Sequence, residues 1–584
     1  MSRPLLGTGF FILKIFFGGI MKLTGAQMVC ESLIREGVDT MFGIPGGAIL
    51  PLYQTFHEYP QLKHILVRHE QGAAMAADGY YRVTGKVGVA MATSGPGATN
   101  LVTGLATAHM DSTAVVAITG QVARGALGKD AFQECDITGV TLPVTKHNYL
   151  VMDINDIPRV IKEAFYLAKS GRPGPVLVDI PKDLFTEEAE FIYPETVEIP
   201  GYSPTLEGNL AQVKKAVSLI NSAKKPVILS GHGAVLSRAF DEVKDLAERA
   251  QIPVITTLLG ISSFPETHVL SLGMPGMHGV AYASMALDQA DLIISLGARF
   301  DDRVTGKLSS FAPNAKIIHI DIDPSVIGQN VRTQVPLVGD VKSVLQTLNP
   351  QVKQNNHEDW VQHIEEMRIN HPSLRLREKD KLTQQYIIKK ISDITQGGAV
   401  VVTGVGQHQM WTAQYYTFSE PNSWVTSGGL GTMGFEVPAA MGAQVGRPDS
   451  TVWSICGDGG FQMTLSDLAT IVENKLPIKF AIMNNHFLGM VRQWQHLFYE
   501  DTFTATQYSG NPDFVKLAEA YGIHSFRVTE KSEVDNAITD AMEHDGPVLI
   551  DFMVDHEENV YPMIPPGESV KEIVEEPTEE PTWR

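Results

Sequence analysis

Three successive sets of short apolar runs, each alternating with stretches of helical character, span this 584-residue sequence. The runs are rich in Val, Ile, Leu and Ala and end at turn residues, which is typical of strands buried on both faces of a parallel sheet. Parallel strands need a crossover connection, usually a helix, between them. The pattern therefore predicts an α/β fold of three doubly wound parallel-sheet domains.

Shifts in composition mark the expected boundaries. We expect an N-terminal extension over 1–20, with Met21 as the natural start, domains over 21–190, 205–350 and 380–566, and an acidic, solvated tail over 567–584. A Pro-rich stretch around Tyr193–Pro204 predicts a linker, and a polar span near Pro350–Lys381 leads to the third set. The expected strands are 39–42, 64–67, 87–92, 114–118 and 175–179, then 226–230, 252–255, 291–296 and 316–320, then 399–402, 451–455, 479–483 and 548–551.

Composition excludes several classes of protein. Hydrophobic residues make up 43% and charged residues 19% of the chain, as in globular rather than disordered or fibrous proteins. The net charge of −20 makes nucleic acid a poor partner. The extension has Lys14 within its apolar stretch and is short for a membrane span, so no membrane partner is expected. The three scattered cysteines argue against a disulfide framework and fit a cytoplasmic protein.

The sharpest motif lies in the third set. Gly457-Asp458-Gly459-Gly460 follows one expected strand and Asn484-Asn485 follows the next. Glycines let backbone amides approach a phosphate, and the oxygens of Asp and Asn suit Mg²⁺. Ligands of doubly wound sheets bind beyond the carboxyl ends of the strands, where both segments are expected. GDG alone occurs in many turns, but together with the two asparagines it favours a metal–diphosphate site over an ordinary turn.

The first set supplies a candidate acid. Glu70 follows a strand and opens a helix, and on its own such an acid merely interacts with the helix N-terminus. The glycine-rich segments 42–47 and 94–100 also follow strands in this domain. Their presence favours a cofactor contact for Glu70.

Residues 21 to about 566 resemble the catalytic subunits of the acetohydroxyacid synthase (acetolactate synthase) family, which are thiamine diphosphate-dependent transferases. The GDG…NN pair matches the thiamine diphosphate motif, and the more specific matches are 131–134, 145–149, 170–175, 299–306 and 488–495. The resemblance implies that pyruvate is decarboxylated and its two-carbon unit joined to a second 2-oxo acid. Pyruvate as acceptor gives 2-acetolactate and 2-oxobutyrate gives 2-aceto-2-hydroxybutyrate, in the first common step of valine, leucine and isoleucine biosynthesis.

The resemblance also implies roles around thiamine diphosphate. Glu70 would hydrogen-bond the aminopyrimidine N1′, Met433 would be the apolar wedge that bends the cofactor, and Asp458, Asn485 and the backbone oxygen of Phe487 would hold Mg²⁺. The other implied contacts are Gln407, His408, Gly431, Gly457, Gly459, Gly460, Gly489 and Met490. The chain departs from the family at Glu436-Val437, where Gly-Leu is usual, and this puts only the local packing in doubt.

The middle set has a Rossmann-like alternation but no GxGxxG, so its spacing alone does not identify a dinucleotide site. The resemblance implies a structural FAD, held by Arg172, Gly231, Gly233, Thr257, Leu258, Met277, His278, Gly297, Arg299, Asp301, Arg303, Asp321, Ile322 and Asp340. The implied substrate residues are Gly47, Ala48, Phe132, Gln133, Lys182, Arg303, Met490 and Trp494. Without the resemblance, Trp494 would be interpreted as a core aromatic.

The family further implies a homodimer or larger assembly with active sites between chains, and a separate small regulatory subunit. The alternatives are a pyruvate oxidase-like enzyme with redox-active FAD, a catabolic acetolactate synthase without FAD, and an inactive FAD-binding scaffold. The segments 299–303 and 490–494 favour the anabolic synthase over the other two enzymes. The presence of Glu70, Asp458 and Asn485 argues against an inactive scaffold.

Overall fold

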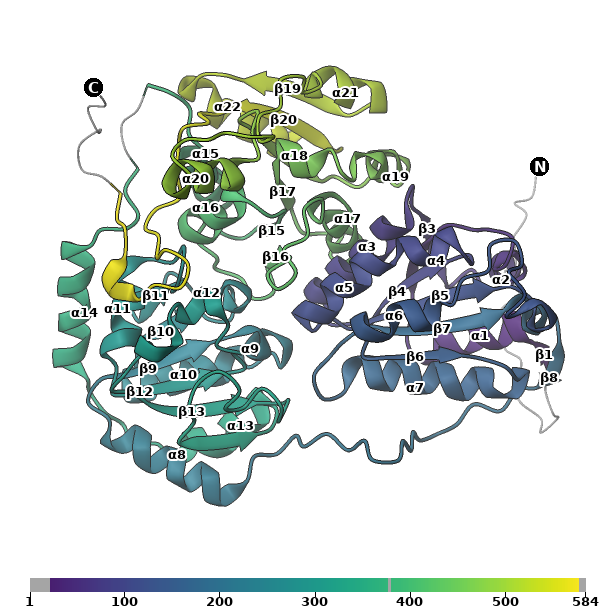
Figure 1. Cartoon of the computed structure of the whole chain (residues 1–584), viewed down its shortest axis with the longest axis horizontal. Coiled ribbons are helices and arrows are strands. Elements are labelled where there is room, and N and C mark those ends of the chain that lie inside the picture. Colours follow the sequence, from purple (N-terminus) through teal and green to yellow (C-terminus); the bar gives the residue numbers. More distant parts are fainter. Residues whose placement is uncertain (1–21, 377–379, 577–584) are drawn as a thin grey trace, which may run out of the picture.

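The computed structural model describes residues 22–376 and 380–576, and it contains three six-stranded parallel sheets, each with helices on its faces (Figure 1). The predicted fold class is thereby confirmed. The extension expected over 1–20 lies outside the described residues. A small antiparallel pair, β1 (Lys22–Thr24) with β8 (Glu188–Glu190), joins the two ends of the first domain.

The first domain has the strand order β3-β2-β4-β5-β7-β6. Alternate residues of its strands point into two separate cores, Ala90 into one and Val89 and Met91 into the other, so both faces are buried. The strands are β2 (Thr40–Gly43), β3 (Lys63–Leu66), β4 (Gly88–Ala92), β5 (Val115–Gln121), β6 (His147–Leu150) and β7 (Val176–Pro181). The helices are α1 (Gly25–Arg35), α2 (Leu50–Thr55), α3 (Glu70–Thr84), α4 (Pro96–Asn100), α5 (Val102–Asp111), α6 (Ile137–Thr141) and α7 (Ile157–Lys169).

The second domain has the order β11-β10-β9-β12-β13-β14. Counted along the chain this is 3-2-1-4-5-6, the order of dinucleotide-binding Rossmann sheets. Its strands are β9 (Pro226–Ser230), β10 (Val254–Thr256), β11 (Ser271–Gly273), β12 (Leu292–Leu296), β13 (Lys316–Asp321) and β14 (Val335–Val338). Its helices are α8 (Leu210–Ser222), α9 (His232–Leu236), α10 (Phe240–Ala250), α11 (Ala281–Gln289), α12 (Asp302–Thr305), α13 (Val341–Leu348) and α14 (Glu358–Asn370).

The third domain has the order β16-β15-β17-β18-β20-β19. Counted along the chain, the first and third sheets are both 2-1-3-4-6-5. The strands are β15 (Val400–Thr403), β16 (Trp424–Thr426), β17 (Val452–Gly457), β18 (Lys479–Asn484), β19 (His524–Val528) and β20 (Val548–Met553). The helices are α15 (Gln384–Thr395), α16 (Gln407–Tyr415), α17 (Glu436–Gly446), α18 (Asp458–Phe461), α19 (Leu468–Glu473), α20 (Gly489–Phe498), α21 (Phe514–Tyr521) and α22 (Lys531–Glu543).

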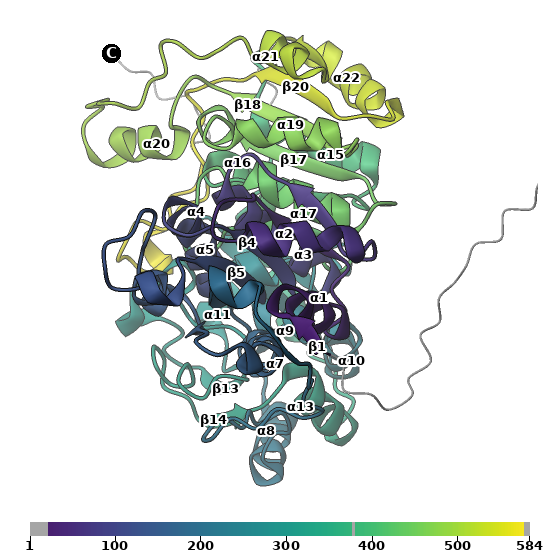
Figure 2. The same cartoon turned by 90° about the vertical axis from the view of Figure 1, so that its right-hand side faces the viewer.

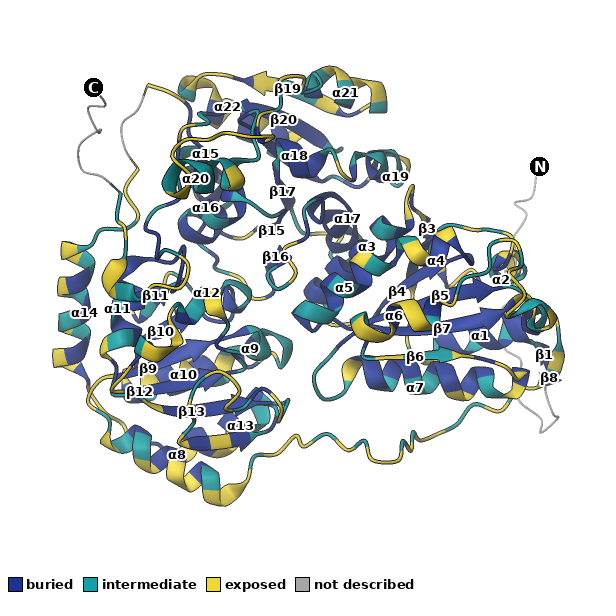
Figure 3. Ribbon diagram, viewed as in Figure 1, coloured by how far each residue is buried: buried dark blue, intermediate teal, exposed yellow. Residues whose placement is uncertain are grey.

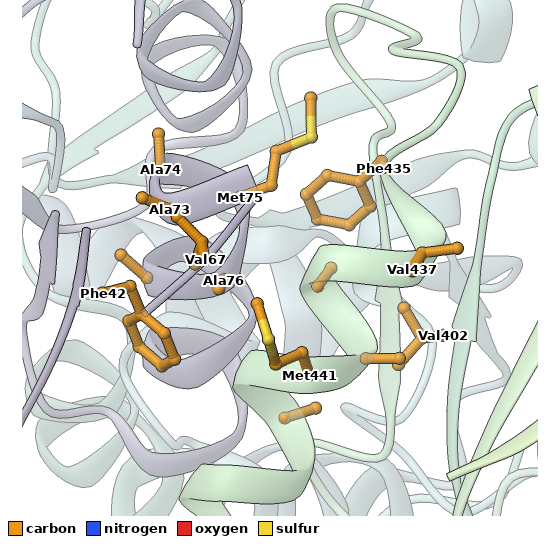
Figure 4. Packing of buried hydrophobic residues seen from close by; sticks show 14 of the residues in the cluster. Phe42, Val67, Ala73, Ala74, Met75, Ala76, Val402, Phe435, Val437 and Met441 are labelled. Carbon is orange, nitrogen blue, oxygen red and sulfur yellow. The ribbon is translucent and has the colours of Figure 1, made fainter. Parts of the chain in front are cut away.

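Two helices join the first and third domains into one continuous hydrophobic core (Figure 4). Helix α3 carries four alanines on either side of Met75, at 73, 74, 76 and 77, and it packs along α17, which contributes Val437 and Met441. Their backbones approach closely at two glycines: a Cβ on Gly79 would lie 2.2 Å from the Ala439 oxygen, and one on Gly442 would lie 1.9 Å from the Ala76 oxygen. No side chain fits at either glycine without moving a helix.

Of the two segments expected to be connections, one contains a packed helix and the other runs outside the sheets. The span near Pro350–Lys381 contains α14, whose Trp360, Ile364 and Met367 lie on one face and are buried against the second sheet. This helix follows the boundary expected at 350, and its largely polar composition gave no sign of packing; its exposed outer face is visible in Figure 3. The linker after Tyr193 does run outside the sheets, although the Tyr193 hydroxyl donates to Glu36 at 2.6 Å.

The C-terminal segment returns from the third domain to the second (Figure 1). Its Ile564 N–H donates to the Met277 oxygen at 2.9 Å, and the Lys307 N–H donates to the Glu568 oxygen at 3.0 Å. Met563 and Val574 form an isolated antiparallel bridge. Residues 567–576 of the expected solvated tail are exposed or half-buried, but these backbone hydrogen bonds tie them to the rest of the chain, and 577–584 lie outside the described residues.

Candidate active site

The segment Gly457–Gly460 lies where the sequence predicts it, at the carboxyl end of β17, beside the end of β18. Asp458 is buried at 1% exposure, and its Oδ2 accepts a hydrogen bond from the Asn511 amide at 2.7 Å. Burial raises the pKa of Asp458 to about 6, and the hydrogen bond from Asn511 opposes that rise. A cation at this carboxylate would offset the cost of burying its charge.

The second predicted metal segment follows β18. The Asn485 Oδ1 accepts the Phe487 N–H at 2.9 Å in a tight turn, with His486 at a φ of 59°. The turn is held from outside, because the Tyr508 N–H donates to the His486 oxygen at 2.7 Å. No cluster of three or more His, Cys, Asp and Glu side chains occurs in residues 22–376 and 380–576. The arrangement instead suits Mg²⁺, which uses one or two carboxylates and completes its shell with phosphate and water oxygens.

His408 and Gln407 begin helix α16 next to this segment. A Cβ on Gly457 would lie 2.9 Å from Cε1 of His408. Burial lowers the pKa of His408 to about 4, and its buried Nε2 has no hydrogen-bond partner among the described residues. A buried polar atom without a partner is costly, and a diphosphate oxygen would supply the missing one.

Gln407 differs from the prediction in detail. Its side-chain NH₂ donates to Oε1 of Gln493 at 2.9 Å and to the Glu558 oxygen at 2.8 Å. Its own oxygen faces Gly489, where a Cβ would lie only 2.2 Å away. Both side-chain N–H bonds are therefore used within the chain, and Gln407 presents a carbonyl oxygen rather than a donor to this site.

The loop that carries Met433 is held by the first domain. Asp111 accepts the N–H of Gly428 at 3.1 Å and of Gly429 at 2.6 Å, and the hydroxyls of Thr107 and Thr432 are 2.7 Å apart. Asp111 is in turn paired with buried Arg82 at 2.7 Å. Met433 itself is half-buried, with Gly431 at a φ of 73° before it, so the predicted wedge projects from an anchored loop.

Glu70 is the first residue of α3 and is 9% exposed. Its Oε2 accepts a hydrogen bond from the Asn100 amide at 2.9 Å, and a Cβ on Gly97 would lie 3.2 Å from Oε1. Asn100 and Gly97 belong to the predicted segment 94–100 that follows β4. The structure thus brings Glu70 and this segment together as expected.

The predicted substrate residues fall into three groups on three domains. In the first domain, the Ala48 N–H donates to Oγ1 of Thr93 at 3.2 Å, next to Gly47, and a Cβ on Gly95 would lie 2.8 Å from the Gln133 oxygen. Phe132 is 89% exposed. Within the described parts of the chain, these residues, Lys182, Arg303 and the pair Met490 and Trp494 are not joined by any hydrogen bond or ion pair across the three domains.

Met490 and Trp494 lie on α20, which stands at the margin of the third domain (Figure 2). Trp494 is half-buried and meets Phe498 edge-on with ring centroids 5.7 Å apart. Gln493 is the one fully buried side chain of this helix. Trp494 is therefore not a core aromatic in this chain.

Five of the predicted FAD residues line one cavity of about 340 Å³ in the second domain, together with residues of the first. The five are Gly233, Gly297, Asp321, Ile322 and Asp340. A Cβ on Gly233 would lie 2.6 Å from the Gly297 Cα, so these two loops need glycine to pass. Burial raises the pKa of Asp321 to about 6, and the N–H of Asp323 opposes the rise. Arg172 reaches this edge and donates to Asp323 at 3.3 Å.

The remaining predicted FAD residues are not among those that line this cavity. The Met277 N–H donates to the Arg303 oxygen at 2.8 Å, and the neighbouring His278 has a buried Nδ1 without a partner among the described residues. Asp301 caps α12, and Arg299 lies 4.0 Å from it. Gly231 and Thr257 make backbone hydrogen bonds at the ends of β12 and β9, and the Leu258 oxygen accepts from the Trp424 indole at 2.9 Å.

Sequence reasoning missed the residues that support the motifs. Asn511 holds Asp458, Asp111 holds the loop before Met433, and Tyr508 covers Gly459, where a Cβ would lie 2.7 Å from its hydroxyl. Asp467 also joins the domains by accepting the Arg68 N–H at 2.8 Å. None of them lies within a glycine-rich or strand-end motif, so only the folded chain reveals them.

Known proteins are similar to this chain over most of its length. Residues 23–140 match the N-terminal TPP (thiamine pyrophosphate) binding domain of thiamine pyrophosphate enzymes, 213–348 the central domain, and 404–552 the C-terminal TPP binding domain. The chain is 51% identical over 566 residues to an acetolactate synthase of Mycobacterium bovis, covering 95% of this chain and 92% of that protein. It is 49% identical over 563 residues to the acetolactate synthase large subunit of Corynebacterium glutamicum, with 94% and 90% covered. The large subunit of Porphyra purpurea is 47% identical, with 94% and 95% covered.

Proposed function

Because the chain belongs to the acetolactate synthase family of thiamine pyrophosphate enzymes, we propose that it decarboxylates one pyruvate and joins the two-carbon unit to a second 2-oxo acid, releasing CO₂. The observation that carries this proposal is the group of strand-end residues in the third domain. Buried Asp458, the Asn485 turn and the unpartnered Nε2 of His408 meet beside the glycines of 457–460. These are the donors and acceptors that a magnesium–diphosphate group requires.

Each part of the chain then has a distinct task. Thiamine diphosphate, when bound, supplies a carbon acid and an electron sink for decarboxylation. Asp458, Asn485 and the Phe487 oxygen would hold Mg²⁺, while Met433 would set the shape of the cofactor from its anchored loop. Glu70, oriented by Asn100 at 2.9 Å, would bind the aminopyrimidine and pass a proton to or from it.

Choice of acceptor is assigned to helix α20. An apolar wall distinguishes 2-oxobutyrate from pyruvate by one methylene, which is worth about 1–3 kcal/mol. Trp494 and Met490 are only half-buried on this helix, as wall residues need to be. The first-domain residues Gly47, Ala48, Phe132, Gln133 and Lys182, with Arg303, would complete the channel and provide cations for the acceptor carboxylate.

We further assign FAD to the second domain. The 3-2-1-4-5-6 strand order and the cavity lined by Gly233, Gly297, Asp321, Ile322 and Asp340 support a dinucleotide there. The flavin would be structural. A redox flavin of the pyruvate oxidase type is the second candidate, and the products formed from pyruvate separate the two.

Assembly into at least a homodimer is also proposed. Phe132, Leu430 and Met463 are exposed at 89%, 44% and 55% although they flank the predicted site, and a second chain would cover such apolar side chains. A separate small regulatory subunit is proposed from the large-subunit names of the relatives. None of the helices in the described ranges is long and apolar enough to cross a bilayer. The free cysteines 30, 135 and 456 are compatible with the proposed cytoplasmic location.

One incubation tests the function. The purified chain is supplied with pyruvate, Mg²⁺, thiamine diphosphate and FAD, and the products are identified. We expect 2-acetolactate, and 2-aceto-2-hydroxybutyrate when 2-oxobutyrate is added. Hydrogen peroxide or acetyl phosphate would instead identify an oxidase, and no consumption of pyruvate would contradict both.

A further inference from the structure

A second buried carboxyl group lies beside the proposed diphosphate site. Glu436 is the first residue of α17 and is 0% exposed. A Cβ on Gly404, which follows β15, would lie 2.3 Å from its Oε2, and a Cβ on Gly460, which follows β17, would lie 2.6 Å from its Oε1. The carboxyl group is therefore wedged between the ends of two neighbouring strands. Its place is the crevice in which Gly459 and Gly460 would offer amides to the diphosphate.

Neither carboxyl oxygen of Glu436 has a hydrogen-bond partner within the described residues. Burial raises the pKa of Glu436 to about 7, and the nearby backbone amides of Glu436 and Gly434 oppose the rise without reaching hydrogen-bond geometry. Arg82, on the helix α3 that packs against α17, is already paired with Asp78 and Asp111. The group thus lacks a counter-ion and a donor, two conditions that favour its neutral form.

A neutral carboxylic acid has one O–H donor, whereas a carboxylate has none. A carboxylate in this crevice would repel the diphosphate, but an acid can donate a hydrogen bond to a phosphate oxygen. We propose that Glu436 binds the diphosphate as a neutral acid, so that cofactor binding and protonation of this side chain are coupled. The proton comes from solvent when the cofactor enters and returns to solvent when it leaves.

This inference rests on the proposed binding of thiamine diphosphate by the third domain. Other groups that titrate or carry charge lie on the elements packed against α17, namely Glu70, Asp78 and Arg82 on α3, Cys456 on β17, Asp458 on α18 and Asp467 just before α19. Cys456 interacts electrostatically with Glu436, and burial raises the pKa of its thiol. All of these groups and the cofactor's own phosphate are present in both the wild type and Glu436→Gln. A difference in pH dependence between these two proteins therefore reports the titration of Glu436. A Cys456→Ser control tests the contribution of the thiol.

The test measures binding rather than turnover. Dissociation constants for thiamine diphosphate with excess Mg²⁺ are determined between pH 6 and pH 9 for the wild type, Glu436→Gln and the control Cys456→Ser. Glutamine keeps the size and a donor but cannot ionise. We expect similar affinities for all three at pH 6, within about threefold. Above the carboxyl pKa, the wild type and Cys456→Ser lose up to about tenfold more affinity per pH unit than Glu436→Gln.

Proton uptake gives an independent measure. Calorimetric titration with thiamine diphosphate at pH 8, in two buffers of different ionisation enthalpy, yields the number of protons bound with the cofactor. The wild type and Cys456→Ser are expected to take up about one proton more than Glu436→Gln. If Glu436→Gln does not fold, the wild type alone still decides, because uptake of less than about half a proton at pH 8 excludes the coupling.

Two results would overturn the proposal in different ways. Parallel pH curves and equal proton uptake in the wild type and Glu436→Gln would make Glu436 a packing residue and leave the cofactor assignment intact. Absence of thiamine diphosphate binding by every variant at every pH would remove the cofactor assignment itself, and the role of Glu436 with it.

Discussion

The first and third domains share one strand order, 2-1-3-4-6-5, yet carry different chemistry. Helices α3 and α17 occupy the same place in the two orders, after the second strand, and they pack on each other. Each begins with a buried glutamate, Glu70 in the first domain and Glu436 in the third. Glu70 has a hydrogen-bond partner in Asn100, whereas Glu436 has none among the described residues. The same helix start thus serves an oriented carboxylate in one domain and an unpartnered acid in the other.

The strand order that the two domains share therefore does not determine the role of the glutamate at the helix start. In the third domain, the segments after β17 and β18 bring Asp458 and Asn485 to one edge, so the neighbouring carboxyl group faces a site for an anion and a cation. In the first domain, the corresponding strands β4 and β5 are followed by segments without such a pair, and Glu70 faces Asn100 instead. The loops after the strands make the difference, and substitutions there should separate the two roles.

The largest effect is expected for Glu70→Gln. Loss of a positioned acid–base group slows the proton transfer it serves by about 10²- to 10⁴-fold. Exchange of the reactive thiazolium proton of the bound cofactor, followed by NMR after acid quench, measures this step directly. Glu436→Gln is the matched control, and it should leave the exchange rate within about threefold at pH 6. Exchange at the wild-type rate in Glu70→Gln would remove its assigned role.

Asp458→Ala should come next. Removing a direct metal ligand costs at least as much as the roughly 10- to 100-fold loss of metal affinity seen when a supporting partner is removed. Affinity for thiamine diphosphate should fall at least about 100-fold, and added Mg²⁺ should restore only part of it. Asn511→Ala, which removes the hydrogen bond to the carboxylate, serves as a graded comparison with a smaller loss. Unchanged, Mg²⁺-dependent binding by Asp458→Ala would contradict the proposed metal site.

The two helices themselves can be forced apart. Gly442→Ala would place a methyl group 1.9 Å from a backbone oxygen of α3, and Gly79→Ala would place one 2.2 Å from a backbone oxygen of α17. Overpacking of this kind costs about 1–3 kcal/mol of unfolding free energy, measurable by urea denaturation. Gly510→Ala, with open space around its Cβ, is the control and should change stability little. Similar losses at both glycines would confirm that the contact is symmetric, and no loss would show that the helices can separate freely.

The smallest effect is expected for Trp494→Leu, on helix α20 of the third domain. Shortening the wall should reduce the preference for 2-oxobutyrate by up to about tenfold, since a methylene contact is worth only a few kcal/mol. The ratio of the two products in a mixture of pyruvate and 2-oxobutyrate measures the change. Trp424→Leu, at a buried site in the same domain, controls for general disturbance. An unchanged ratio would mean that Trp494 does not select the acceptor.

The interior strands of the three large sheets could be predicted from the sequence, whereas five of their six edge strands could not. The thirteen expected strands all correspond to observed ones, among them the edge strand β3. The short strands β1 and β8 of the small pair were missed, and so were five strands of the large sheets, β6, β11, β14, β16 and β19. These five strands are at sheet edges. Edge strands mix polar with apolar residues, as in His147–Leu150, or contain a proline, such as Pro336. Central strands are buried on both faces and therefore read as continuous apolar runs.

A similar division holds for the site. Residues within motifs that follow strands, such as Asp458, Asn485 and Glu70, lie at the strand ends where the sequence predicts them. Their supports come from elsewhere in the chain: Asn511 from a loop after α20, and Asp111 from the end of α5. Long-range partners of this kind depend on packing, which leaves no local pattern. The departure at Glu436 could be recognised from the sequence, but its unpartnered carboxyl group in the crevice could not.

The returning C-terminal segment has a consequence for how the chain is made. Val560 binds Gln493 of α20 at 2.8 Å, and Ile564 and Glu568 bind the second domain. Domains of a nascent chain fold in order as they emerge during synthesis. These contacts lie after β20, the last strand of the third sheet, so this additional tie between the second and third domains can close only after all three sheets have been synthesised. A chain cut after Met553 would keep every strand of the three sheets but lose these contacts, and the hydrogen bond from Trp424 to Leu258 would remain.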